Sequence, residues 1–379
     1  MSKKININDR RLFSFKVFTV FLAFLMGLWG VLGIYNATVF SGDPFYFAGK
    51  QLIWLLLGLF ILLISAHVPF RFYKNNVFKL SFIAYIALFS VLFLGVKVNG
   101  MKGWFDLYLF YIQPSEIAKP IFILSLCCIT AWKEKKQLSE HLFFFILFAV
   151  TALWCLPIVL EPDFGTLLIY ITGFFIVYFL SGGKFIYFAM LFGFMLLGAV
   201  TVYFMEPYVA ARINSFLNPA QDPLGAAWHL RQLQYTMARG GFSGQNWGES
   251  LWANVYLPLP YSDSVFAALV EAVGFIGTFP VVLAFAALVF AGVNLSKGII
   301  SILRRNFILG MTSLISVQAF LHMSVNVTML PATGITLPLF SYGSSSMIAT
   351  MLSLGIALSA VRDNSNEESL SELCPIPDE

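Results

Sequence analysis

Long runs of apolar residues with almost no charge recur along this chain, and they constrain its fold more than any other feature. Residues 51–68 and 164–181 are two such runs, and neither contains Asp, Glu, Lys or Arg. A helix of about 20 apolar residues is long enough to cross the hydrocarbon core of a bilayer. Only 11% of the 379 residues are charged, against about 25% in a soluble domain. The chain is therefore predicted to be a polytopic integral membrane protein.

About ten transmembrane helices can be placed on these runs. We place them at about residues 15–35, 51–68, 78–96, 115–132, 142–160, 164–181, 185–205, 264–292, 306–327 and 339–360. The expected fold class is therefore all-α. Because the number of spans is even, both chain termini are expected on the same side of the membrane.

The basic residues indicate which side that is. One set of alternating loops, together with the two ends of the chain, carries Lys3, Lys4, Arg10, Arg11, Arg71, Lys74, Lys79, Lys133, Lys135, Lys136, Lys184, Lys297, Arg304, Arg305 and Arg362. The short loops on the other side carry Lys50, Lys97 and Lys102. Since positive residues concentrate on the cytoplasmic side, both termini are expected in the cytoplasm. Residues 1–14 would form the N-terminal segment and residues 363–379 an acidic, disordered tail.

One long hydrophilic stretch, residues 206–263, separates the seventh and eighth predicted spans, and the topology puts it outside the cytoplasm. It is rich in Gly, Asn, Gln, Trp and Arg, which favours an ordered surface over a flexible linker. Its arginines Arg212, Arg231 and Arg239 could make forked contacts to phosphate oxygens. The other interpretation is an interfacial amphipathic helix whose arginines reach toward the headgroups.

A polar motif precedes the fourth predicted span. The segment QPSEIAK, residues 113–119, contains Pro114, which suits the first turn of a helix. Glu116 and Lys119 are three residues apart and therefore share a helix face. They are either a neutralising ion pair in a capped helix or part of a functional site.

A second motif, EPDFGT at residues 161–166, forms a tight connection between the fifth and sixth spans. Both Glu161 and Asp163 are expected at the outer interface. Asp163 would cap the next helix by accepting from backbone amides. Alternatively, the two acids would bind a cation or hold an arginine of the long loop.

Two acids flank the start of the eighth predicted span. Asp263 is expected at the N-cap or in the first turn of that helix. Glu271 follows eight residues later inside the apolar run, about 12 Å deeper at a rise of about 1.5 Å per residue. An acid inside a membrane usually faces a cavity or a polar partner, so capping does not explain Glu271.

Four motifs occur along the chain in a fixed order. They are NG…W…QPSE.AK at 99–119, PDFGT at 162–166, NP..DP.G at 218–225 and TGITLPLFSYGSSS at 333–346. On ten spans with a long outer loop, this series resembles the shape, elongation, division and sporulation (SEDS) family of bacterial cell-wall polymerases, which includes FtsW, RodA and SpoVE. The resemblance covers about residues 15–362 and is slightly closer to the division and sporulation branches than to the elongation branch.

The resemblance implies a peptidoglycan glycosyltransferase in the bacterial cytoplasmic membrane. Such an enzyme polymerises lipid II into glycan strands at the outer leaflet, for cell division or cell-shape maintenance. A class B penicillin-binding protein and other divisome or elongasome membrane proteins are the implied partners, with no nucleic acid and no organic cofactor. The family's essential aspartate lies in the context (H/S)-(T/S)-D-F-x-F-A, which matches Asp263 in YSDSVFA, where Ser264 replaces the usual Phe. The family's SYGGSS reads SYGSSS here.

The residues suit this chemistry. The attacking sugar hydroxyl needs a base or a metal-bound carboxylate, and the pyrophosphate that leaves needs cations. We expect Asp263 to be the base or to hold a divalent metal, Mg or Mn. Residues expected to bind the pyrophosphate region of lipid II are Glu116, Lys119, Arg212, Ser341 and Ser345, and those expected to shape the cavity are Gln113, Asp163 and Glu271.

Two other functions stay open at this stage. A transporter that flips lipid-linked precursors would show internal repeats and broken helices that meet near the midplane. The sequence has no convincing repeat and its polar residues gather at the outer surface, but Glu271 favours this alternative. A scaffold that only recruits a partner enzyme would tolerate loss of Asp263.

Overall fold

The computed structural model describes residues 7–40, 42–98, 101–108, 110–220, 225 and 227–362. Its helices are α1 (Ile7–Ala37), α2 (Pro44–His67), α3 (Phe70–Asn75), α4 (Val77–Leu94), α5 (Pro114–Lys136), α6 (Glu140–Leu160), α7 (Phe164–Leu180), α8 (Phe185–Met205), α9 (Pro207–Leu217), α10 (Trp228–Gly240), α11 (Leu251–Val255), α12 (Val265–Ser296), α13 (Ile302–Asn326) and α14 (Ser344–Arg362). Some parts of the predicted motifs and termini lie outside the described residues. They are Asn99 and Gly100, residues 221–224 of the third motif, residues 1–6 and the predicted tail at 363–379.

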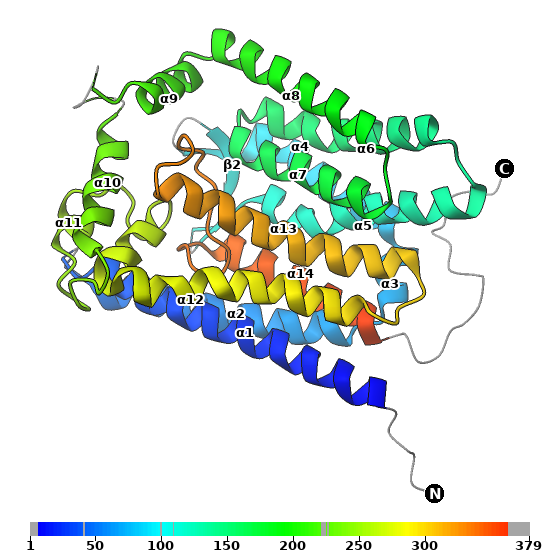
Figure 1. Ribbon diagram of the computed structural model, residues 1–379, viewed down its shortest axis with the longest axis horizontal. Coiled ribbons are helices and arrows are strands. Elements are labelled where there is room, and N and C mark those ends of the chain that lie inside the picture. The colour runs from blue at the N-terminus through cyan, green and yellow to red at the C-terminus, as the bar shows by residue number, and fades with distance from the viewer. Residues whose placement is uncertain are drawn as a thin grey trace, which may run out of the picture.

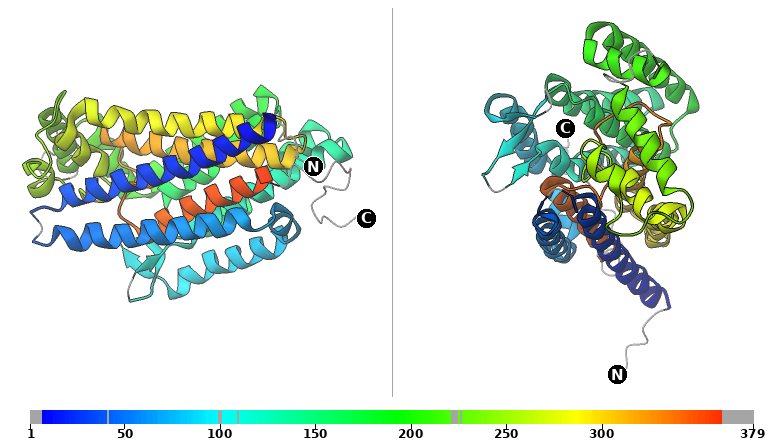
Figure 2. Two further views of the ribbon diagram at one scale, coloured as in Figure 1. Left: turned by 90° about the horizontal axis from the view of Figure 1, so that it is seen from below. Right: turned by 90° about the vertical axis from the view of Figure 1, so that its left-hand side faces the viewer.

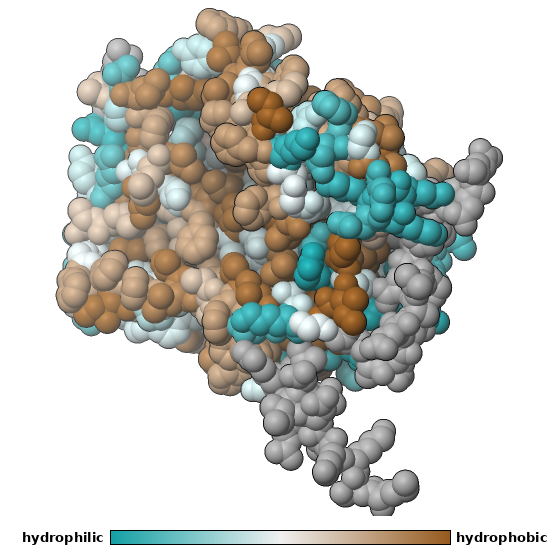
Figure 3. Space-filling model, turned by 45° about the vertical axis from the view of Figure 1, so that its right-hand side comes forward, coloured by the Kyte–Doolittle hydropathy of each residue, from teal (hydrophilic) through white to brown (hydrophobic). Residues whose placement is uncertain are grey.

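Each predicted span coincides with a helix. Within the described ranges, nine helices are long and apolar enough to cross a membrane, namely α1, α2, α4, α5, α6, α8, α12, α13 and α14. The remaining predicted span, the sixth at 164–181, is α7, which is shorter at 17 residues. The long helices lie along one common axis (Figure 1). Apolar residues cover most of the face in Figure 3, with hydrophilic residues gathered at its right-hand side and, in a smaller group, along its left-hand edge. The prediction of a helical polytopic membrane protein is confirmed.

Two of the helices begin at an aspartate that caps their first turn, and the second of these caps was predicted. Asp43 accepts from the backbone N–H of Tyr46 at 3.0 Å at the start of α2. Asp163 accepts from the N–H of Thr166 at 2.9 Å at the start of α7. Each aspartate satisfies an amide that the first turn of a helix leaves without a partner, so these starts are fixed locally.

The centre of the bundle is formed by α5, α13 and α14, which are the most deeply buried of the long helices. The close approach of α14 to α2 depends on small residues. A Cβ at position 355 would lie 1.9 Å from the Ser65 hydroxyl oxygen, and a Cβ at position 58 would lie 2.9 Å from Met351. Glycine at both places therefore lets the two helices pack tightly. The first turns of α5 and α14, which carry two of the motifs, are held in this rigid centre.

A small antiparallel sheet lies between α4 and α5, which the all-α expectation did not include. Its strands are β1 (Val96–Val98), β2 (Met101–Asp106) and β3 (Tyr111–Ile112), in the order β1-β2-β3. No strand was predicted in this segment, because strands of two to six residues are too short to show clear alternation. The sheet leads directly into Gln113 and the start of α5.

The described part of the long loop is ordered, as expected, and is mostly helical. It contains α9, α10 and α11, of which α9 and α10 are amphipathic. α10 and α11 lie at the end of the bundle opposite to Ile7, where α1 begins, and Arg362, where α14 ends (Figure 1). We call the end that carries α10 and α11 the outer end.

One long helix, α12, is broken near its outer end. Gly274 has φ 65° and ψ −170° inside the helix. Residues 241–246, a glycine-rich part of the long loop, lie across the break. Four backbone hydrogen bonds of 2.8 to 3.1 Å join the two segments: Phe275 to Gly241, Ile276 to Phe242, Gln245 to Glu271 and Asn246 to Ala272. The loop thus satisfies backbone groups that a broken helix in a membrane would leave unpaired.

α8 stands apart from the other long helices (Figures 1 and 2). Its first turn packs on α6 and α7 through ring contacts, with centroids 4.7 Å apart for Tyr187 and Phe144 and 5.4 Å apart for Phe188 and Phe175. Further along, it packs chiefly on α9. Apolar side chains such as Phe192 are exposed there, as expected for a helix that faces lipid.

Candidate active site

A cavity of about 1070 Å³ opens at the outer end, where the motifs meet. Its walls come from the sheet, from the starts of α5, α7 and α14, from α9 and α10, and from the segments before α12 and after α13. The lining includes Lys50, Trp104, Tyr111, Gln113, Glu116, Asp163, Thr166, Arg212, His229, Tyr261, Ser262, Asp263, Ala332, Thr336, Tyr342 and Ser345. Segments far apart in the sequence therefore form one site.

Asp263 lies half-buried at the cavity, in the turn before α12. The prediction that it caps α12 is wrong. The N-cap residue is Ser264, and it makes no side-chain cap hydrogen bond. The Asp263 backbone carbonyl accepts from Asn326 at 2.9 Å, which holds the turn. Its carboxylate, which accepts from the Ser262 hydroxyl at 3.3 Å, is thus left for the cavity.

The electrostatics around Asp263 combine burial with one cation. Burial raises the pKa of the Asp263 carboxyl above its ordinary value, and Ser262 and Arg212 partly oppose this shift. Arg212 donates from Nη1 to the backbone carbonyl of Ala332 at 2.9 Å. Burial lowers the pKa of Arg212, and the Asp263 carboxylate opposes that change. The acid and the cation thus stand at one wall of the cavity, where they influence each other.

His229 was not predicted from the sequence, and it lies beside these residues. Its Nε2 is 3.0 Å from the Ser264 hydroxyl, which itself donates to the Pro258 carbonyl at 2.9 Å. Because the hydroxyl hydrogen is used on Pro258, Nε2 must be the donor, which assigns the tautomer. Burial, then Arg212, lowers the pKa of His229. No sequence signal pointed to it, since one histidine in an amphipathic helix is usually a surface or packing residue.

A smaller cavity of about 340 Å³ adjoins this one. Apolar residues such as Phe216, Leu230 and Leu233 dominate its walls. The residues that line both cavities are Arg212, His229, Val325, Pro331 and Ala332, so the boundary between them is partly polar and partly apolar.

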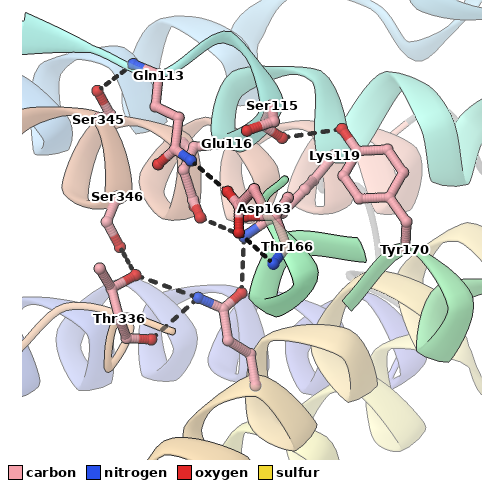
Figure 4. A network of polar contacts seen from close by, with 12 residues as sticks. Gln113, Ser115, Glu116, Lys119, Asp163, Thr166, Tyr170, Thr336, Ser345 and Ser346 are labelled. Atoms are coloured by element: carbon pink, nitrogen blue, oxygen red, sulfur yellow. Dashed lines mark hydrogen bonds and ion pairs between the residues drawn. The ribbon is translucent and has the colours of Figure 1, made fainter. Parts of the chain in front are cut away.

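The QPSE motif forms a buried polar network (Figure 4). Lys119 donates to Glu116 Oε1 at 2.7 Å and to Gln318 Oε1 at 2.9 Å. Gln318 in turn donates to the Thr336 carbonyl at 3.0 Å. Glu116 lines the cavity, but Lys119 lies behind it, 6% exposed. The predicted ion pair is present, and it ties α5 to α13 and to the TGITLP segment.

A second part of this network explains Asp163 and Gln113 (Figure 4). Asp163 Oδ2 accepts from the Thr166 hydroxyl at 2.7 Å and from Gln113 Nε2 at 2.9 Å. Together with its bond to the Thr166 amide, this makes Asp163 a helix cap that also holds the sheet–α5 junction. The Ser345 hydroxyl accepts from the backbone N–H of Gln113 at 2.9 Å. The capping interpretation thus describes the contacts of Asp163.

Glu161 follows directly after α6 and is buried, 1% exposed. Its place at the membrane interface stays a prediction. Neither carboxylate oxygen has a hydrogen-bond partner among the described residues. Burial, with a smaller contribution from Asp163, raises the pKa of Glu161 to about 8. Glu161 is therefore mostly protonated at neutral pH and does not add a full negative charge beside the site.

Ser341 and Glu271 support the site without lining it. Ser341 donates to the Ser262 carbonyl at 2.8 Å and accepts from the Leu337 amide at 2.8 Å, which fixes the turn that carries Asp263. Glu271 accepts from Arg239 Nε at 2.9 Å and from the first amides of α11. Glu271 thus caps a short helix from a neighbouring one.

A divalent metal was expected as an option at Asp263. In the described ranges, no group of three or more His, Cys, Asp and Glu side chains could hold a metal by itself. A single carboxylate suits Mg²⁺, which commonly takes one or two protein carboxylates and completes its shell with substrate phosphates and water. Asp263 would be that ligand.

The fold and the cavity define a class of protein: a polytopic membrane protein with a cavity at its outer end that charged, polar and aromatic residues line. Comparison with known proteins gives the family. The model of the FtsW/RodA/SpoVE family, described as "Cell cycle protein", matches residues 12–366. The chain therefore belongs to this family, which is the SEDS family expected from the motifs.

Named relatives and solved structures agree with this assignment. Stage V sporulation protein E of Bacillus subtilis (strain 168) is 31% identical over 84% of this chain and 88% of its own length. A probable peptidoglycan glycosyltransferase FtsW of Tolumonas auensis is 33% identical, over 84% of each chain. A chain in a solved structure described as "Structural coordination of polymerization and crosslinking by a peptidoglycan synthase complex" has a TM-score of 0.78 and 25% identity, over 92% of this chain and 98% of that one. A mutant of the Thermus thermophilus rod shape determining protein RodA gives a TM-score of 0.71 at 24% identity, over 92% and 98%, and shares the fold.

Proposed function

We propose that this chain is a peptidoglycan glycosyltransferase that polymerises lipid II into glycan strands. Family membership and the names of the FtsW relatives support this activity. The single observation that carries the proposal is that Asp263 lines the outer cavity with a carboxylate that caps no helix. The Asp263 carboxylate accepts one long hydrogen bond, from the neighbouring Ser262, and is therefore available for chemistry.

In the proposed reaction, Asp263 takes the proton from the acceptor sugar hydroxyl. That oxygen forms a bond to the anomeric carbon of the lipid-linked donor, and the bond from this carbon to the phosphate oxygen breaks. The electron pair leaves with the lipid diphosphate. A base works best when its pKa lies near the working pH, and burial moves the Asp263 pKa in that direction.

The leaving diphosphate needs positive charge, and Arg212 supplies it at the wall shared with Asp263. If Mg²⁺ or Mn²⁺ takes part, it would neutralise the same diphosphate with Asp263 as its protein ligand. Glu116 lines the cavity with Ser345, while Lys119 and Ser341 hold the walls in place. In this proposal Lys119 and Ser341 act as supports, which revises their expected contact with the substrate.

We further propose that both termini lie in the cytoplasm and that the outer end faces away from it. The alternation of basic loops supports this orientation. A class B penicillin-binding protein is the proposed partner, supported by the likeness to a chain of a peptidoglycan synthase complex. The proposal also includes other membrane proteins of the divisome or elongasome.

The test is glycan-strand formation from labelled lipid II by the purified chain with its co-occurring transpeptidase, in wild type and in Asp263→Asn. Penicillin suppresses cross-linking and moenomycin silences unrelated transglycosylases. We expect polymer from wild type and none from the folded variant. Equal polymer from both would contradict the role of Asp263. No polymer from either, under conditions where another family member works, would contradict the activity itself.

A further inference from the structure

The proposed reaction makes a demand that one cation does not meet. In the first condensation, donor and acceptor are both copies of the same lipid-linked sugar, so each carries a diphosphate. Two diphosphates held close to one aspartate repel each other unless each has its own positive partner. Arg212 accounts for one of them.

Lys50 is the second cation. Among the described residues that line the cavity, Lys50 and Arg212 are the Lys and Arg side chains. Lys119 lies outside this set because its ammonium is buried on Glu116 and Gln318. The two lining cations come from different helices, since Arg212 belongs to α9 and Lys50 to the second turn of α2.

The ammonium group of Lys50 is held by a side chain one turn earlier in α2. Its ammonium donates to the Tyr46 hydroxyl at 2.6 Å and lies 4.3 Å from the centre of that ring. The next residue, Gln51, is fully buried and bonds the Ser341 carbonyl at 3.1 Å and the Gly343 amide at 3.3 Å. Lys50 is thus anchored beside the segment that braces the Asp263 turn.

Three aromatic rings lie next to this lysine. Phe47 stacks on Tyr261 with centroids 5.1 Å apart, and Tyr342 meets both rings edge-on at 5.6 and 5.8 Å. Tyr261 and Tyr342 line the cavity, and the Tyr342 amide donates to the Tyr261 carbonyl at 2.8 Å. Aromatic faces with polar tips suit sugar rings, whose C–H groups and hydroxyls need both. Tyr261 is also only two residues before Asp263.

We propose that Lys50, Tyr261 and Tyr342 form a second subsite, which binds the diphosphate and the first sugar of a second lipid-linked substrate molecule. This inference rests on the proposed function, because it assigns a place to the second substrate of that reaction. Arg212 and Lys50 then hold one diphosphate each, with Asp263 between the two sugars.

Native mass spectrometry in detergent tests the subsite by counting bound lipid II. The Asp263→Asn chain is used so that the substrate is not consumed. We expect two bound molecules on this chain, and one on the chain that also carries Lys50→Met. Lys50→Arg keeps the charge and should restore the second molecule. Lys97→Met is the matched control, because Lys97 is an exposed outer lysine on β1 outside the cavity lining, and it should leave two molecules bound.

A second experiment measures the polymerisation kinetics of the same lysine variants in the chain that retains Asp263. Lys50→Met should raise the half-saturating concentration of lipid II about tenfold, as expected for the loss of one charge-assisted hydrogen bond, while Lys97→Met leaves it unchanged. A peptide-free lipid-linked disaccharide should show the same difference, because the proposed ligand is the diphosphate. A difference seen only with the peptide present would contradict the diphosphate assignment and point to a peptide carboxylate.

The outcomes separate the subsite from the activity. Two molecules bound to both Lys50→Met and its control, or one molecule bound to the Asp263→Asn chain alone, would overturn the subsite even if the enzyme polymerises lipid II. Loss of the second molecule in Lys50→Met would uphold the subsite even if the wild type made no polymer. Equal melting temperatures of the Lys50 and Lys97 variants would exclude unfolding as the cause.

Discussion

Asp263 and Glu271 are eight residues apart at the outer end of α12, and their carboxylates differ in burial and in the hydrogen bonds that they accept. Glu271 is fully buried, yet every part of its carboxylate is used: one oxygen accepts from Arg239 and the Trp252 amide, and the other from the Ala253 amide at 2.6 Å. Asp263 is half-buried, and from the described residues its carboxylate accepts only a long bond, from its neighbour Ser262.

This contrast shows that depth in the membrane does not by itself mark a functional acid. The sequence made Glu271 the harder residue to explain, and its role in the structure is to hold α10, α11 and α12 together. Asp263, the less buried of the two acids, is the one whose carboxylate caps no helix. Glu271 was also the feature that favoured a transporter, and its ion pair with Arg239 removes that support.

The largest effect expected from this comparison is on catalysis. Asp263→Asn should lower the rate of lipid II polymerisation by about 10² to 10⁴, the usual contribution of a general base. Asp106→Asn is the control, since Asp106 is an exposed acid on β2. Single-turnover rates with labelled lipid II measure the effect, and a loss of less than tenfold would mean that Asp263 is not the base.

The next largest effect is on stability. Glu271→Ala should destabilise the chain by roughly 3 kcal/mol, because it leaves buried amides of α11 unpaired and removes an ion pair. Arg239 is 40% exposed, so water compensates part of its loss. Thermal melting in detergent should show a clear drop, whereas Glu249→Ala, at an exposed acid of the same loop, should melt like wild type. Equal melting of both variants would refute the structural role.

A smaller effect is expected at His229. His229→Leu removes the donor to Ser264 and should slow polymerisation about tenfold, the equivalent of one hydrogen bond near 1.4 kcal/mol. His229→Gln keeps a donor on a side chain of similar reach and should retain most of the activity. If the Leu and Gln variants had the same rate, the hydrogen bond to the Asp263 turn would be irrelevant to catalysis.

The smallest effect is the pH dependence of stability at Asp263. Its pKa is raised in the folded state, so the folded state favours the protonated acid. This contribution is full below the unfolded pKa of about 3.9 and is lost as the pH rises through the folded pKa. Asp263→Asn should therefore melt above wild type at pH 7, and the difference should shrink in acid. A variant that melts lower than wild type at pH 7 would show that the carboxylate stabilises the fold.

How much the sequence predicted depended on the kind of signal. The spans were predictable because apolar runs of membrane length are a strong and local pattern, and the helix start at Asp163 followed from capping chemistry. The meeting of Gln113, Asp163 and Ser345 was suggested only by the family resemblance, because hydrogen bonds between residues 50 or more positions apart leave no periodic trace.

Other features gave no local signal at all. The break at Gly274 lies within an uninterrupted apolar run, and only the loop at 241–246 makes it tolerable. The expected N-cap moved from Asp263 to Ser264 because the backbone of the turn is fixed by Asn326 and Ser341. Both are tertiary effects that outweigh local preference.

The cavity also has an electrical property that its side chains do not reveal. The helices α5, α7, α9, α10, α12 and α14 begin at its wall, and α13 ends there. Each helix start carries the equivalent of about half a positive charge, because the peptide dipoles align along the axis. The lining side chains include three acids, Glu116, Asp163 and Asp263, against the two cations Lys50 and Arg212. The helix starts outnumber the one helix end, so their macrodipoles offset part of this acidic excess, as the proposed binding of a lipid diphosphate requires.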